Sequence, residues 1–123
     1  MAKACADAVL DGLLDIVATA TKQIACSAQP TTYTEANATY ALADIVIDGG
    51  DFTKANGDTN GRKITIGAQS SVNVDASGTA THVALVITGS STLLYVTTCT
   101  SQALTSGGTV TIPAWDVELA DPT

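Results

Sequence analysis

The stretch SGTATHVALVITGSSTLLYV, residues 77–96, predicts two β-strands joined by a short Gly-Ser-Ser turn. Its first half carries apolar side chains on both faces of the strand, with Val83, Leu85 and Ile87 on one face and His82, Ala84 and Val86 on the other. A strand that is apolar on both faces lies in the centre of a sheet or at a packed interface. This hairpin therefore predicts a sheet that is covered by other elements.

Outward from this hairpin, the chain after residue 22 consists of short β-like runs separated by turn residues. Besides the hairpin strands 81–89 and 91–104, the runs are QIACSAQP (23–30), TYALADIVIDGG (39–50), GRKITIGAQ (61–69), SVNVDAS (71–77) and GGTVTIPAWDVELA (107–120). Such runs at this spacing predict an antiparallel β-sandwich or flattened barrel. We therefore expect a mainly β domain over residues 23–123.

The segment ACADAVLDGLLDIVATATKQ, residues 4–23, has a different period. Apolar residues repeat at helical spacing, which predicts one amphipathic helix within residues 1–22. An isolated helix of this length is marginal in water, so its stripe must pack on the sandwich or on the same helix of a neighbouring subunit. Its members are Val9, Leu10, Leu13, Leu14 and Val17, and we expect Val9, Leu13 and Val17 to form the interface.

Acidic residues exceed basic ones, with 12 Asp and Glu against 5 Lys and Arg and a net charge of -7. This charge repels phosphate backbones, which argues against nucleic-acid binding. Asp7, Asp11 and Asp15 repeat on one face of the predicted helix, and we interpret them as a solvated face instead of a metal site. They also interrupt the run of about 20 apolar residues that a membrane span needs, so we expect no membrane association.

His82 is the single histidine of the 123 residues, and it stands where the first strand of the hairpin opens. A general base needs a nucleophile or acid partner, and no nearby residue supplies one. The sequence also lacks the GxSxG, P-loop and HExxH motifs. We therefore expect His82 to be a half-exposed structural residue, and we expect neither an enzyme nor a cofactor.

The segment DGGDFTKANGDTNGRK, residues 48–63, is a predicted surface loop with one candidate cation site. Asn56, Asp58 and Asn60 stand before Gly61 as oxygen ligands do in the first half of a calcium loop. Gly67 occupies the position of the bidentate glutamate, so charged ligands are missing. Asn-Gly and Asp-Gly steps are also typical of β-hairpin tips, which is the interpretation we prefer to a weak calcium site.

Three cysteines leave an odd number and show no zinc-type spacing. Cys26 and Cys99 lie in strand-like runs, so we expect them to be small buried apolar residues. Cys5 stands before the predicted helix, where it could form a disulfide with another subunit in an oxidising medium. The alternative is that Cys5 is buried on the helix face that carries Val9.

The order of motifs in residues 24–122 resembles a group of small phage virion proteins. The resemblance is carried by Ser27, Pro30 and Thr31, by Gly78, Thr79, Thr81, His82 and Leu85, and by Thr105, Gly107, Thr109 and Ala114. It implies a virion part synthesised in the bacterial host cytoplasm, with the major capsid protein or other virion subunits as partners. A capsid decoration protein that reinforces the head is the leading hypothesis, and a homo-oligomer, preferentially a trimer, is expected by analogy.

Two alternatives remain beside the decoration protein. A tail or fibre-attachment protein belongs to the same group of virion parts. A carbohydrate-binding β-sandwich module is a different class, against which the 4% aromatic content speaks. The helix and Cys5 are additions to the pattern of the group.

Overall fold

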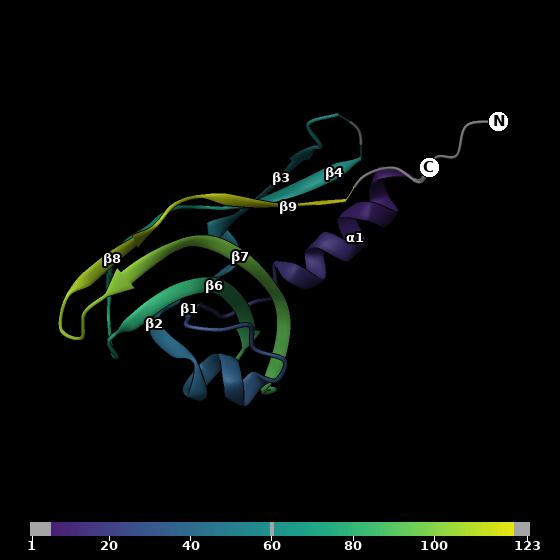
Figure 1. The fold of residues 1–123 in the computed structure, drawn as a ribbon. Helices are drawn as coiled ribbons and strands as arrows, with labels where there is room; N and C mark the ends of the chain where they lie inside the picture. The colour runs from purple at the N-terminus through teal and green to yellow at the C-terminus, as the bar shows by residue number, and fades with distance from the viewer. Residues whose placement is uncertain (1–5, 60, 120–123) are drawn as a thin grey trace.

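The computed structural model describes residues 6–59 and 61–119 and shows two β-layers with one helix at their edge (Figure 1). The mainly antiparallel β architecture and the N-terminal helix confirm the fold class predicted from the sequence. The elements are α1 (Asp7–Val17), β1 (Lys22–Cys26), the π-helix η1 (Glu35–Thr39), β2 (Ala41–Val46), the 3-10 helix η2 (Gly49–Asp51), β3 (Phe52–Asn56), β4 (Arg62–Ile66), β5 (Gln69–Asn73), β6 (Gly78–Ile87), β7 (Thr92–Leu104), β8 (Thr109–Ile112) and β9 (Trp115–Leu119).

The first layer is a four-stranded antiparallel sheet with the order β2-β1-β6-β7. The β6–β7 hairpin is its longest unit, and in Figure 1 both strands curve around the core. The side chains of Val83, Ala84, Leu85 and Val86 are all buried, so β6 is covered on both faces as its sequence predicted. One face packs on the second layer, and the other lies beneath the segment that contains η1.

The second layer consists of the three-stranded sheet β3-β4-β9 and the two-stranded sheet β5-β8. The pair Ile66↔Trp115 ends the first sheet, and the pair Gln69↔Ile112 begins the second. Each strand advances by three residues between these two pairs, so the two sheets continue one another in the same register up to Gln69, and a register shift follows between Gln69 and Val72. Pro113 lacks a backbone N–H and lies in the gap, where a ladder hydrogen bond cannot form.

Three apolar clusters hold the layers together. Two lie between the sheets, around Leu42 and Val72 at one end and around Leu85 and Ile64 at the other. The third contains Ile24, Cys26, Ala36, Ala84 and Val86 and lies between the four-stranded sheet and η1. The expected strands are therefore present, but η1 was not predicted.

Helix α1 ends at Val17, earlier than the predicted boundary at residue 22, and Lys22 already belongs to β1. No side chain caps its first turn, so the helix depends on tertiary contacts for its stability. Leu14 is fully buried in the cluster of Leu85 and Ile64, and Leu10 is nearly so. Within the described residues, no helix is long and apolar enough to cross a membrane.

Candidate interaction site

The outer face of α1 carries three large apolar side chains that the sandwich does not cover. Val9, Leu13 and Ile16 are 57%, 52% and 57% exposed, and their spacing puts them on one stripe of the helix. Val17, which we predicted in this set, is instead partly buried against the cluster that holds Leu14. The exposed stripe, named the α1 stripe below, is therefore Val9, Leu13 and Ile16.

Acidic residues fix the orientation of this helix. The Nε of Arg62 donates to Asp11 Oδ1 at 2.8 Å, and the Nζ of Lys54 donates to Asp15 Oδ1 at 2.6 Å. The two cations lie on β4 and β3, so this face of α1 turns toward the sheet. The predicted solvated face is correct for Asp15, whose side chain is 58% exposed, and wrong for Asp11, which is 25% exposed.

Because the two ion pairs turn the acidic face of α1 toward the sheet, the α1 stripe faces solvent. At about 100° per residue, Asp11 and Asp15 lie on the side of α1 away from the α1 stripe. Both carboxylates are paired within the chain, so a partner that covers the α1 stripe does not have to desolvate an unpaired carboxylate. The side of α1 that carries the α1 stripe is therefore an uncharged, apolar surface.

Two of the candidate calcium residues, Asn56 and Asp58, lie where the β3–β4 hairpin turns, so most of the predicted loop 48–63 is η2 and the hairpin. Asn56 Oδ1 accepts from Arg62 Nη1 at 2.8 Å, and Asp58 Oδ1 accepts from Lys63 Nζ at 2.8 Å. The hydrogen bond from Lys63 to Asp58 raises the pKa of the lysine. Asn60 lies outside the described residues, among which no group of three or more metal-ligating side chains occurs.

His82 lies inside β6, which begins at Gly78, and not at the opening of the strand as predicted. It is half-buried as expected, and it pairs across the sheet with Cys26 and Thr98. Its Nδ1 lies 2.8 Å from the hydroxyl of Thr81, which itself donates to the carbonyl of Ser27. These contacts fit the predicted structural role.

The two described cysteines differ in their surroundings. Cys26 is fully buried, as predicted, and burial raises the pKa of its thiol to about 11, with the nearby Cys99 adding to the shift. Cys99 is only partly buried, so its prediction as a core residue is wrong. Neither forms a disulfide, and Cys5 lies outside the described residues.

Two of the residues that carried the resemblance, Gly107 and Pro30, have structural roles in turns and in the core. Gly107 has a φ of 89° in the β7–β8 turn, a conformation that favours glycine, and its N–H donates to the carbonyl of Val74. Pro30 is fully buried after β1. A comparison with known protein families, curated proteins and solved structures found no match for this chain.

Proposed function

We propose that this protein is a structural component of a phage virion, and specifically a capsid decoration protein that binds the outside of the head. The sequence resemblance supports the virion assignment. The α1 stripe is the observation that supports assembly with other subunits, because it is an apolar surface that the chain itself leaves exposed. The partner would be the major capsid protein or another virion subunit.

The size of the α1 stripe favours assembly on a repetitive surface over tight binding in dilute solution. Each of its half-exposed side chains contributes about 1 kcal/mol when it is covered. The sum of about 3 kcal/mol is below the 4–15 kcal/mol or so that association costs in lost freedom of motion. A shell that holds many copies close together lowers this cost of association, because it raises the local concentration of the chain.

We propose that the α1 stripe joins copies of this chain, with a trimer as the preferred assembly because rings at local symmetry axes use each interface fully. The variant Leu13→Ser/Ile16→Ser should remain folded and lose the oligomer that light scattering detects at high concentration. Thr19→Ser, an exposed position two residues after the end of α1, is the control. A trimer that survives the double substitution would place the interface elsewhere.

Copy number in purified particles distinguishes the head from the tail. Hundreds of copies per particle would support a decoration protein, whereas about a dozen or fewer would support the tail or fibre-attachment protein, which is the second candidate. Absence of the protein from particles would overturn the virion assignment. The carbohydrate-binding module is disfavoured because Trp115 is stacked on Tyr95, with ring centroids 5.9 Å apart, and donates its Nε1–H to Gln23.

The proposed disulfide of Cys5 with another virion subunit has its own test. An unstrained bond of this kind would stabilise an interface by about 2–4 kcal/mol. Non-reducing electrophoresis of intact particles should show a heavier band that disappears with reductant and in Cys5→Ser. Migration as a monomer with trapped thiols would exclude the cross-link.

A further inference from the structure

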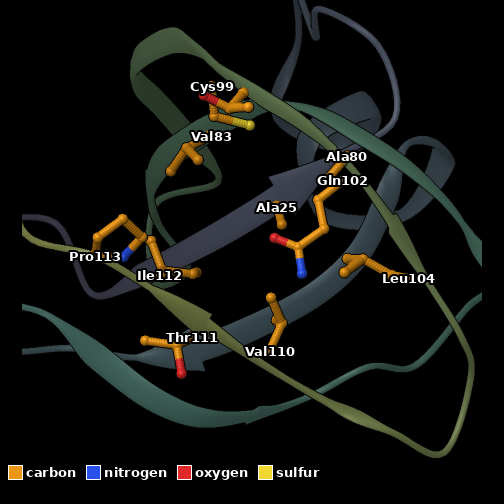
Figure 2. A pocket seen from close by; sticks show the side chains of 11 residues that line it. Ala25, Ala80, Val83, Cys99, Gln102, Leu104, Val110, Thr111, Ile112 and Pro113 are labelled. Carbon is orange, nitrogen blue, oxygen red and sulfur yellow. The ribbon is translucent and has the colours of Figure 1, made fainter.

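A groove runs along one side of the sandwich, between β7 of the first layer and the β8–β9 strand pair of the second. It consists of two adjoining pockets of about 170 and 350 Å³ that share Val83, Cys99, Thr100, Ile112 and Pro113. Figure 2 shows the first pocket, with Cys99 and Val83 at one end, Leu104 and Val110 at the other, and the Gln102 side chain between the strands. The second pocket continues to Trp115 and Asp116.

Both walls of this groove are edges of sheets. Within the described residues, β7 pairs only with β6, β8 only with β5, and β9 only with β4. The outward N–H and C=O groups of an edge strand are a template on which another chain can pair. An extended segment laid in the groove would therefore find backbone partners along β7.

The sequence of β7 lacks the devices that protect an edge by charge or by proline. Its 13 residues, TLLYVTTCTSQAL, include neither a charged residue nor a proline. Three other edge strands carry charges, since β2 has Asp44, β3 has Lys54, and β9 has Asp116 and Glu118, whereas the shorter edges β5 and β8 have none. A long uncharged edge is a liability in a free protein, which is consistent with its being covered by a partner.

An irregularity in β7 shapes the groove. The register shifts between Ala80↔Gln102 and His82↔Thr98, so that residues 99–101 face Thr81 alone. Bulges of this kind re-aim side chains. As a result, four consecutive residues, Thr97 to Thr100, line the second pocket, where a regular strand would present every other residue.

The chemistry of the lining defines the occupant. The first pocket has no charged side chain, and its volume of about 170 Å³ matches a cavity that holds one benzene-sized group. The one charged lining residue is Asp116, which also accepts from the Thr65 hydroxyl and lies 3.5 Å from Lys63. That lysine is shared with Asp58, so carboxylates outnumber cations at this end of the groove.

We propose that this groove binds an extended segment of another protein, six to eight residues long, by β-strand addition to β7. Alternate apolar side chains enter the pockets, and a basic residue lies near Asp116. A segment of this length spans about 20–26 Å. The charge of -7 on the whole chain further favours a basic segment over an acidic one.

The test selects peptides from a displayed library of random ten-residue sequences on the full-length Cys5→Ser protein. Thr100→Lys protein is added in solution as a competitor, so that peptides that bind outside the groove are removed. Selected peptides should alternate β-branched with other residues, carry Lys or Arg, and lack Pro and Glu. Binding should weaken about tenfold or more in Thr100→Lys and less than about twofold in Ser101→Lys. Ser101 is the matched control because it is exposed on the same strand and lines neither pocket.

A second measurement uses Cys99, which lies in both pockets. Alkylation of its thiol by iodoacetamide should slow several-fold when a selected peptide is bound, and Thr98→Lys should restore the rate. The proposal is overturned if the library yields no peptide that distinguishes Thr100→Lys, or if Ser101→Lys has an equal effect. It is also overturned if the free protein forms a dimer that Thr100→Lys dissolves, because the edge would then serve a second copy.

Discussion

The two long sides of the sandwich are closed to different degrees. On one side, β2 and β5 are joined by the bridge Ala43↔Val74, and the N–H groups of Asp75 and Ala76 donate to the Leu42 carbonyl. On the other side, β7 and β8–β9 leave the groove between them. The comparison shows that one fold can use one pair of edges for stability and leave the other pair available for binding.

Substitution of a core residue on the closed side should have the largest effect. Leu42 is 5% exposed and packs closely on Gly78, so Leu42→Ala should lower the free energy of unfolding by about 2–4 kcal/mol. Val110→Ala, in the wall of the groove, should cost about 1 kcal/mol or less. Urea denaturation of both variants measures the difference, and equal losses would show that the groove wall belongs to the core.

The cysteines allow a test by pH. Burial raises the pKa of Cys26 from 9.0 to about 11, so the folded state holds this proton more tightly than the unfolded state does. The resulting stability is complete below pH 9.0 and is lost as the pH rises through about 11. Its size is about 2–3 kcal/mol at about 1.4 kcal/mol per pKa unit.

Urea midpoints measured across this pH range should therefore fall more in the wild-type protein than in Cys26→Ala. Cys99→Ala is the control from the groove side of the sandwich. Burial also raises the pKa of the Cys99 thiol, but this thiol is less buried than that of Cys26. A pH dependence that is unchanged in Cys26→Ala would contradict the buried thiol as its source.

Gln23 and Trp115 form a polar contact beside the groove, and their variants should have a smaller effect than Leu42→Ala. Trp115 Nε1–H donates to Gln23 Oε1 at 2.8 Å, while Gln23 Nε2 is buried and has no partner among the described residues. Gln23→Leu should cost about 1–2 kcal/mol by leaving the indole unpaired. In the Trp115→Phe background, Gln23→Leu should cost less or should stabilise the protein, because no indole is left unpaired. A double-mutant cycle by urea denaturation measures this coupling, and strictly additive effects would contradict it.

The sequence predicts the strands well where apolar residues alternate, as in β4, or follow one another without a break, as in β6. It misses β3, because FTKAN has no regular alternation and follows a Gly-Gly-Asp run typical of turns. It also merges β8 and β9, which Pro113 separates, and it does not reveal η1, whose sequence EANAT has no marked helical stripe. Local patterns therefore predict strands that carry regular or continuous apolar residues, and they fail for short polar elements.

The candidate site was predicted in part. Val9 and Leu13 are exposed as an interface needs, but the choice between Val17 and Ile16 depends on where Arg62 and Lys54 hold the helix. These cations are distant from Asp11 and Asp15 in the sequence, so no local pattern shows the pairing. The groove was not predicted either, because β7 and β8 are close in the sequence but belong to different sheets, which depends on their pairing with β6 and β5.

The cluster that contains Leu14 also contains Val117, so residues from α1 and β9 complete the same core. A ribosome releases the chain from its N-terminal side, and α1 therefore emerges long before the strand that covers its partners. Until β9 has left the exit tunnel, Leu14 and Ile64 lack part of their packing. The consequence is that this part of the core is complete only once β9 is available, and until then the apolar residues of α1 lack part of their cover.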